Sequence, residues 1–229
     1  MKGIVIPVKA FANAKSRLAR YLMPNERVEL ARAFCLDLFA TIAKVRGVDA
    51  VFVISNESCA LEWAKQNGWV TLTESQQLSE SASVDFACHS CESLGIKALL
   101  RIPTDVPLLR SEDVEQIFAA LDGATSCVMI PSRDGTGTNA LLRSPPRAFP
   151  SLFGKDSLAR HREAAHAAGV AVKIIRNQRI ELDVDEPGDL ELLRGCLSAD
   201  SHTARWFSER DRVPPALSDP FRFPVAQTH

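Results

Sequence analysis

The fold is decided by the opening run Gly3-Ile4-Val5-Ile6-Pro7-Val8, which is apolar and rich in β-branched residues. A short apolar run of this kind is typical of a strand that is buried on both faces. Similar runs occupy residues 50–55 and 98–102, and segments with helical spacing separate the three. Strands that alternate with helices predict an α/β fold, with a mostly parallel sheet and helices on both of its faces.

The rest of the chain continues this alternation. Apolar residues at helical spacing predict helices over residues 25–45, 58–67, 78–94, a stretch beginning near Ser157, and a last stretch that contains Leu190, Leu193 and Leu197. Further strands are predicted at residues 69–72, 128–130 and 171–175. Residues 140–142 are expected to begin a β excursion that covers the ligand site.

The helical pattern stops after about Ser198, and prolines then alternate with aromatic residues: Pro214, Pro215, Pro220 and Pro224 with Trp206, Phe207, Phe221 and Phe223. We therefore predict a single domain over residues 2–197 and a Pro/aromatic C-terminal tail over residues 198–229. Four aromatic side chains are more than a freely disordered segment usually carries. The tail is expected to pack over its own domain or over a second subunit, and the second arrangement is a homodimer.

The composition excludes several classes of partner. The chain has 229 residues, 46% hydrophobic content and a formal net charge of −1, so it can bury a full core and has no bias toward nucleic acid or anionic membranes. No segment approaches the roughly twenty apolar residues of a membrane span, and the N-terminal run is too short for a signal peptide. A cytoplasmic protein without nucleic-acid or membrane partners is expected.

Six cysteines are expected to be mostly buried thiols in a reducing compartment. Cys88 and Cys91 form the pair with metal-like spacing, in Cys88-His89-Ser90-Cys91. This pair lies inside a helical pattern and lacks neighbouring ligands, which favours core packing over a zinc site.

A Gly/Thr loop is a candidate for binding phosphate: Gly135-Thr136-Gly137-Thr138-Asn139. The glycines let the backbone approach a ligand closely, and Thr138 and Asn139 can donate hydrogen bonds to anionic oxygens. Gly154 and Ser157 follow just ahead of a helix, whose first amides attract anions. An ordinary turn of small polar residues is the alternative for the loop.

Charged residues follow the ends of the predicted strands, where open α/β sheets bind their ligands. Lys9, Lys15 and Arg17 follow the first strand, at a place suited to a triphosphate, although solvated surface charge explains any one of them alone. Asp105 follows a later strand and stands between Pro103 and Pro107, which packing explains poorly.

Asp183 and Asp185 form an acidic pair. They share one side of the chain if the segment is extended, and two carboxylates on one side suit a hard divalent cation. Because Pro187 fits the first turn of a helix, Asp185 is alternatively a helix cap.

These segments, taken in order, resemble the CofC/FbiD family, the guanylyltransferases of coenzyme F-420 biosynthesis. The resemblance spans roughly residues 2–196 and rests on Pro7-Val8-Lys9, Lys15-Ser16-Arg17-Leu18, Asp105-Val106-Pro107-Leu108-Leu109, Gly135-Thr136-Gly137-Thr138-Asn139-Ala140-Leu141, Phe153-Gly154 with Ser157 and His161, and Asp183-Val184-Asp185. It implies a nucleotide-diphospho-sugar-transferase-like, Rossmann-like fold in three layers. It also implies attack of a three-carbon phospho-acid on GTP with release of pyrophosphate.

The resemblance assigns roles by position. It implies that Asp105, Asp183 and Asp185 hold Mg²⁺, that Thr138, Gly154 and Ser157 hold the phospho-acid, and that Lys15 and Arg17 contact the nucleotide phosphates, with Lys9 beside them. Asp105, Lys15 and Arg17 are thus the expected catalytic residues. These assignments agree with the chemistry of phosphoryl transfer, which needs positioning and charge neutralisation more than a covalent nucleophile.

One position departs from the family pattern. The family usually has Leu-Asn before the helix that follows the third strand, and this chain has Leu78-Ser79. Serine offers a nucleotide base or ribose one short hydroxyl where asparagine offers a donor and an acceptor. Ser79 is therefore the expected nucleotide contact and weakens the prediction of guanine selectivity.

Two readings compete with this assignment. One is a nucleotidyltransferase for another acceptor, either a sugar-1-phosphate or a phosphonate, and the other is a non-catalytic nucleotide-binding protein on the same fold. The acceptor within the family also stays open among 2-phospho-L-lactate, phosphoenolpyruvate and 3-phospho-D-glycerate. Cys88, His89, Cys91 and His161 are the candidates for contacting the hydroxyl group of phosphoglycerate.

Overall fold

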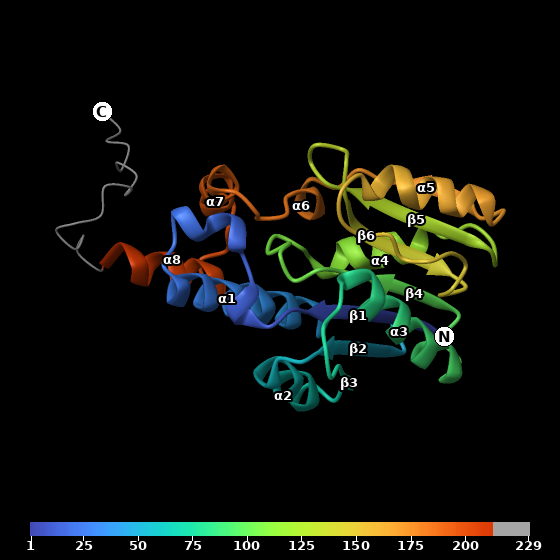
Figure 1. The fold of residues 1–229 in the computed structure, drawn as a ribbon, viewed down its shortest axis with the longest axis horizontal. Helices are drawn as coiled ribbons and strands as arrows, with labels where there is room; N and C mark the ends of the chain where they lie inside the picture. Colours follow the sequence, from blue (N-terminus) through green and yellow to red (C-terminus); the bar gives the residue numbers. More distant parts are fainter. Residues whose placement is uncertain (213–229) are drawn as a thin grey trace.

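The computed structural model describes residues 1–212 and contains one seven-stranded sheet (Figure 1). Its strands are β1 (Lys2–Val8), β2 (Ala50–Ser55), β3 (Val70–Thr73), β4 (Ala98–Arg101), β5 (Ser126–Pro131), β6 (Thr138–Ser144) and β7 (Ala171–Ile174). Their order across the sheet is β3-β2-β1-β4-β6-β5-β7. All neighbouring strands pair in parallel except β6, which is antiparallel to both β4 and β5.

Helices connect the strands and cover both faces of the sheet. They are η1 (Phe11–Asn13), η2 (Ser16–Arg20), α1 (Pro24–Ile42), α2 (Ser58–Gln66), α3 (Glu80–Ser93), α4 (Ser111–Ala119), α5 (Ser157–Ala167), α6 (Gln178–Glu181), α7 (Pro187–Arg194) and α8 (His202–Arg212). Residues of α1, α2 and α4 share one core cluster with the sheet, whereas α3 and α5 pack in the clusters of the opposite face. No helix within residues 1–212 is long and apolar enough to cross a membrane.

The opening run lies at the centre of these three layers. Ile4 and Ile6 pack in the same cluster as Leu38 of α1, and Val5 points to the other face and packs with Val84 of α3. All of these side chains are buried, because a parallel strand with helices on both faces has no solvent side. The predicted α/β architecture with a mostly parallel sheet is confirmed.

The expectation that residues 140–142 begin an excursion over the site is wrong. These residues belong to β6, which lies inside the sheet between β4 and β5. Leu142 pairs with Leu100 on one side and with Val128 on the other. Every residue of β6 is buried, and the apolar run Ala140-Leu141-Leu142 at its centre is typical of a strand that is covered on both faces inside a sheet.

The predicted tail boundary at Ser198 is also wrong, because α8 continues the folded domain. This helix lies along α1 (Figure 1), where Trp206 and Phe207 are buried in a cluster with Leu30 and Phe34. Of the two arrangements expected for the tail, packing over its own domain holds for this segment. Two adjacent aromatics in a polar stretch give little helical periodicity, which hid the helix in the sequence. The prolines at 214, 215, 220 and 224, with Phe221 and Phe223, lie outside the described residues.

A buried carboxylate attaches α8 to α1. Asp37 of α1 accepts hydrogen bonds from the backbone N–H groups of His202 and Thr203, at 2.7 and 2.9 Å, and from the Thr203 hydroxyl at 2.5 Å. The first amides of a helix have no partner within the helix. Asp37 therefore caps α8 from a distant part of the chain.

Replacing this cap is expected to loosen α8. Asp37→Ala leaves the three donors without an acceptor, so the free energy of unfolding should fall by about 1–3 kcal/mol. Urea unfolding measures the loss, and limited proteolysis should show earlier cleavage near α8. Asp122→Ala, at an exposed position, is the control. Equal stability of the two variants would contradict the capping role.

Candidate active site

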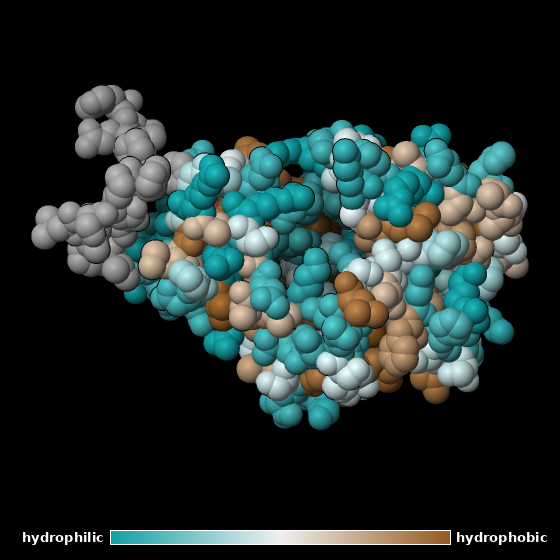
Figure 2. All heavy atoms as spheres, in the orientation of Figure 1, coloured by the Kyte–Doolittle hydropathy of each residue, from teal (hydrophilic) through white to brown (hydrophobic). Residues whose placement is uncertain are grey.

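The candidate site lies where the strand order reverses, at the carboxyl ends of β1 and β4. Ligands in open α/β sheets bind at such switch points. Two adjoining cavities of about 690 and 620 Å³ open here, and both are lined by Lys9, Arg17, Asp105 and Asp185. Figure 2 shows this face hollowed near its centre, with hydrophilic residues around the hollow.

The first half of the site is a cluster of acids and bases. The Lys15 ammonium lies 3.0 Å from Asp105 Oδ2 and 3.3 Å from Asp185 Oδ1, and Arg17 Nη1 lies 3.0 Å from Asp185 Oδ2. The Lys15 side chain is only 7% exposed, whereas that of Arg17 is 68% exposed. A buried ammonium between two carboxylates and an exposed guanidinium at the rim together make a site with paired charges.

The charges in this cluster hold one another ionised. Burial alone would lower the pKa of Lys15, but the charges of Asp105 and Asp185 outweigh it, so this pKa lies above its usual value. Burial would raise the pKa of Asp105, but the Lys15 charge and its hydrogen bond hold this pKa below the usual range. Burial and the Asp105 charge raise the pKa of Asp183, which shows that a further carboxyl group faces the cluster.

Local structure fixes each member of the cluster. Lys15 adopts the left-handed conformation, at φ 53° and ψ 39°, just before η2. The Asp105 carbonyl accepts a hydrogen bond from the Val184 N–H at 3.1 Å, and the Asn139 side chain donates to Asp183 Oδ1 at 3.1 Å. Asp183 and Asp185 both line the larger cavity.

The alternative that Asp185 is only a helix cap is contradicted. Helix α7 begins at Pro187, and Asp189 accepts the hydrogen bonds from the N–H groups of Asp185 and Glu186, at 3.1 and 2.9 Å. The carboxylate of Asp185 instead faces Lys15 and Arg17.

The acidic cluster fits a hard divalent cation in its ligand chemistry and charge. Its donors are carboxylate oxygens, the ligands that Mg²⁺ prefers. Within residues 1–212 no three acidic, histidine or cysteine side chains already surround one ion position. The Lys15 ammonium bridges Asp105 and Asp185 in this arrangement, so a metal ion would have to take over a place that a cation already holds.

The second half of the site presents hydroxyl groups. The Leu152 N–H donates to His161 Nε2 at 2.8 Å, so in the neutral ring the hydrogen is on Nδ1, which lies 3.0 Å from Thr138 Oγ1. His161 therefore donates to the Thr138 hydroxyl, whose own hydrogen has no acceptor within residues 1–212 and can be donated to a ligand. In the same way Ser157 Oγ accepts from the Thr138 N–H at 2.9 Å and keeps its hydrogen. Both hydroxyls line the larger cavity.

The Gly/Thr loop itself is an internally bonded turn. The Thr136 N–H and hydroxyl donate to Asp134, and the Gly137 N–H donates to Ser132 Oγ at 2.7 Å. The hydrogen bond that the Ser132 hydroxyl donates to Asp134, followed by those from Thr136, lowers the pKa of Asp134 to about 2. A Cβ at position 137 would stand 2.8 Å from Ser132 Oγ, which explains the second glycine. The turn interpretation thus holds for residues 132–137, and the anion donors begin at Thr138.

The first amides of α5 are also in use. The N–H groups of Ser157 and Leu158 donate to the carbonyls of Gly154 and Thr136, at 3.2 and 3.0 Å. Gly154 has φ 108°, a conformation that L side chains rarely adopt, and it lines both cavities. The free hydroxyls, rather than these amides, are the donors that this wall offers to an anion.

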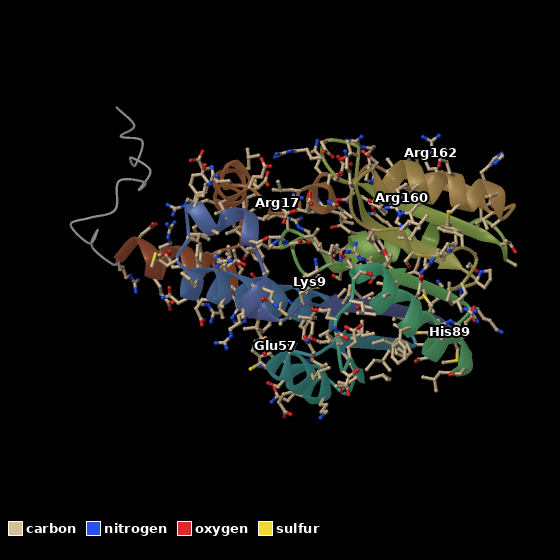
Figure 3. All side chains as sticks on the ribbon, in the orientation of Figure 1. Lys9, Arg17, Glu57, His89, Arg160 and Arg162 are labelled. Carbon is tan, nitrogen blue, oxygen red and sulfur yellow. The ribbon has the colours of Figure 1, made fainter. Side chains whose placement is uncertain are left out.

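The remaining predicted residues divide between the site and the core. Lys9 is exposed at the end of β1 and lines both cavities (Figure 3). Ser79 caps α3, since its hydroxyl accepts from the Ala82 N–H at 3.1 Å, and it lines the smaller cavity. We name the smaller cavity the nucleotide-side cavity and the larger one the acceptor-side cavity, after the roles that the resemblance implies for their lining residues.

The four candidates for contacting a substrate hydroxyl lie elsewhere. Cys88 and Cys91 are buried against the sheet, and burial raises the pKa of these thiols to about 11 and about 12. His89 is exposed on α3, well away from Lys9 and Arg17 (Figure 3). His161 is buried behind Thr138, so it acts on a ligand only through that residue.

The chain also matches a known protein family. The family described as guanylyl transferase CofC like matches residues 1–207. The chain belongs to this family. The resemblance seen in the ordered sequence segments is therefore confirmed, as is the class of nucleotidyltransferase, and the match runs into α8 beyond the predicted tail boundary.

Three relatives of this CofC-like chain carry names that differ in the acid. A phosphoenolpyruvate guanylyltransferase of Conexibacter woesei is 33% identical over 196 residues, 85% of this chain and 88% of the relative. A 2-phospho-L-lactate guanylyltransferase of Methanothermobacter thermautotrophicus is 33% identical over 81% of each chain. A 3-phospho-D-glycerate guanylyltransferase of Colwellia psychrerythraea is 30% identical over 83% of this chain and 90% of the relative.

A solved structure confirms the predicted fold. The putative nucleotide-diphospho-sugar transferase from Desulfovibrio desulfuricans G20 matches with a TM-score of 0.74 at 17% identity, over 92% of this chain and 95% of that one. At this identity the likeness concerns the fold alone.

Two site residues of the CofC-like chain escaped the sequence prediction. Arg101 ends β4 and Glu80 begins α3, and they form an ion pair that lines both cavities. The available signal was a cation at the carboxyl end of an apolar strand, two residues before Pro103. A buried strand rarely ends on an unpaired charge, so Arg101 required a partner that the sequence did not identify.

His161 is expected to make the protein sensitive to acid. Burial, followed by the charges of Arg143 and Arg101, lowers the pKa of His161 to about 3, against 6.5 for the unfolded chain. The unfolded state therefore binds the extra proton as pH falls through 6.5. The His161 contribution to stability is complete above pH 6.5 and declines by about 1.4 kcal/mol per pH unit toward pH 4.

Urea unfolding at pH 7, 6 and 5 measures this decline. The His161→Gln variant should lack this pH-dependent decline, so the difference in the free energy of unfolding between wild type and variant should shrink as pH falls. His89→Gln, at the exposed histidine of α3, should keep the wild-type slope. An NMR titration in which folded His161 ionises near pH 6.5 would contradict the buried neutral ring.

Proposed function

We propose that this chain transfers GMP from GTP to a three-carbon phospho-acid, with Mg²⁺, and releases pyrophosphate, as a step of coenzyme F-420 biosynthesis. The observation that carries the proposal is the junction of two cavities. One wall presents the acid and base cluster around Lys15, and the other presents the free hydroxyls of Thr138 and Ser157. The relatives named for phosphoenolpyruvate, phospholactate and phosphoglycerate support this class of acceptor.

The proposed reaction is a displacement at the α-phosphorus of GTP. An oxygen of the acid's phosphate attacks that phosphorus, the bond to the bridging α–β oxygen breaks, and pyrophosphate leaves with the electron pair. No covalent enzyme intermediate is needed, since phosphoryl transfer depends on positioning and on neutralising charge.

The bases of the site would supply much of that neutralisation. Lys9 and Arg17 are exposed at the shared edge of the two cavities, where the triphosphate would meet the acid. Lys15 stays ionised because the neighbouring carboxylates raise its pKa. An incoming triphosphate offers these cations new anionic partners in exchange for Asp105 and Asp185.

Asp105, Asp183 and Asp185 are the residues that would hold the magnesium ion. When bound, Mg²⁺ supplies positive charge to the phosphate oxygens and orients the triphosphate. Burial and the charge of Asp105 raise the pKa of Asp183, and a cation bound beside it would favour its ionised form.

The acceptor-side cavity would hold the phospho-acid. Thr138 and Ser157 direct hydroxyl donors into it, and Gly154 allows a ligand to approach the backbone without meeting a side chain. These contacts recognise anionic oxygens that all three candidate acids share.

Pyrophosphate release tests the proposal directly. Purified protein with Mg²⁺ and GTP is expected to release pyrophosphate with at least one of the three phospho-acids and not with glucose-1-phosphate. GTP should be preferred over ATP, CTP and UTP, although Ser79 gives the base or ribose fewer contacts than an asparagine would. If only a sugar phosphate or a phosphonate reacts, the proposed phospho-acid acceptor is wrong. If no acceptor reacts, the chain is a non-catalytic nucleotide-binding protein.

Asp105→Asn is expected to reduce turnover by at least about 100-fold with the fold intact, because it removes a negative charge from the proposed metal site without changing volume. It should also reduce the rise in melting temperature that Mg²⁺ with GTP gives the wild type. Circular dichroism checks the fold, and Asp122→Asn, outside both cavities, is the control. Near-normal magnesium-dependent activity in Asp105→Asn would make Asp105 a purely structural partner of Lys15.

A further inference from the structure

An ion pair between Glu80 and Arg101 stands at the boundary of the two cavities. Glu80 is the first residue of α3, and Arg101 is the last residue of β4. Both line the acceptor-side and the nucleotide-side cavities. The Arg101 side chain is 6% exposed and that of Glu80 is 21% exposed. Glu80 Oε1 is buried against Arg101, so Oε2 is the carboxylate oxygen that a ligand can reach.

Arg101 is held rigidly on the acceptor side. Its Nη1 donates to the Asn139 carbonyl at 2.9 Å and to the Thr138 carbonyl at 3.4 Å. Its guanidinium carbon lies 4.1 Å from the centre of the Phe153 ring, next to Gly154. Burial lowers the pKa of Arg101 to about 10, which still leaves it charged at neutral pH.

Burying this pair at a cavity is not explained by stability. A buried ion pair stabilises a fold weakly or not at all compared with apolar residues of the same size. Arg101 Nε is buried and has no hydrogen-bond partner among the described residues, so even the cation is incompletely satisfied. A functional use of the pair is therefore the better explanation.

The chemistry of Glu80 points to a hydroxyl group. A carboxylate only accepts hydrogen bonds, and it repels the anionic oxygens that Thr138 and Ser157 attract. Phosphoenolpyruvate and phospholactate offer no free hydroxyl, whereas phosphoglycerate offers one beside its carboxylate. An acid without that hydroxyl would leave Glu80 desolvated and unpaired, which is a strong means of rejection.

We propose that Glu80, positioned by Arg101, accepts a hydrogen bond from the hydroxyl of the acceptor, so that this chain uses a hydroxylated three-carbon phospho-acid of the phosphoglycerate type. The inference rests on the proposed function and selects among its acceptors. Glu80 is then a specificity-determining residue, and Arg101 is a positioning residue.

The ribose hydroxyls of the nucleotide are the competing donors, because Glu80 lines both cavities. The acceptor is favoured because the hydrogen bonds that Arg101 donates within residues 1–212 go to the carbonyls of Thr138 and Asn139. These two residues line the acceptor-side cavity and not the nucleotide-side cavity. Arg101 is thus bonded to the segment that also carries the Thr138 hydroxyl, one of the two anion donors.

The test compares kcat/KM for the three acids in wild type, Glu80→Ala and Glu80→Gln. Wild type should prefer phosphoglycerate over the two acids without a free hydroxyl by at least tenfold. Glu80→Ala should lower kcat/KM for phosphoglycerate at least tenfold and leave that for phosphoenolpyruvate unchanged or raised. Glu80→Gln keeps the size of the side chain and one acceptor oxygen, so its kcat/KM for phosphoglycerate should lie between those of wild type and Glu80→Ala. It replaces Glu80→Ala in the test if the alanine variant folds poorly.

Glu92→Ala is the matched control. Glu92 also lies on α3 and also pairs with an arginine, Arg147 at 3.5 Å, but it lines neither cavity. Its replacement should leave the ratio between the acids unchanged, and thermal melting should confirm that all variants are folded.

Three outcomes would overturn the inference. The first is a wild type that prefers phosphoenolpyruvate or phospholactate. The second is a Glu80→Ala variant in which all three acids lose activity equally. The third is a variant that changes the discrimination between GTP and its 2′- or 3′-deoxy forms but not between acids. Each of these leaves the proposed function standing, whereas absence of pyrophosphate release with any acid would remove the function itself.

Discussion

The contact of Lys15 with Asp105 and Asp185 joins three segments that are distant in the sequence, and the site depends on it. Lys15 follows β1, Asp105 lies 90 residues further on after β4, and Asp185 lies 170 residues away before α7. Three loops that would otherwise be separate are thus held at one edge of the sheet. The cost is a lysine in the left-handed conformation, which is typical of functional positions that the surrounding structure fixes.

The sheet explains why this contact can form. Parallel strands deliver their carboxyl ends to the same edge, so residues that follow β1 and β4 must meet if the strands are neighbours. Strand β6 runs in the opposite direction, so its first residues, Thr138 and Asn139, lie at the same edge. Asn139 then bonds to Asp183, and Thr138 to Ser157. One strand of opposite direction therefore connects the acidic cluster to the hydroxyl wall.

Sequence patterns predicted most strands and the charged residues of the site, but not which residues these charges contact. β2 was predicted over the residues that it occupies, because its run is apolar and short. β6 was misplaced because local pattern does not reveal which strands are neighbours. α8 was missed because its stability comes from Asp37 and from burial of Trp206 against α1, not from its own periodicity. The pair formed by Glu80 and Arg101 is likewise a tertiary contact. Only Arg101 gave a signal in the sequence, as a cation at the end of an apolar strand.

The two walls of the site prepare for ligands in opposite ways. On the hydroxyl wall the protein uses up the acceptor capacity of Thr138 and Ser157 and leaves their hydrogens free, so an anion gains donors without displacing a protein bond. On the acidic wall Lys15 and Arg17 already pair with Asp105 and Asp185, so a ligand must exchange places with one of these partners. Exchange costs little when the incoming group carries the same charge, because the remaining partner never stays buried and unpaired. In the proposed function a ligand would therefore enter the acidic wall as a matched set of charges, with a polyanion for Lys15 and a cation for the carboxylates that Lys15 leaves.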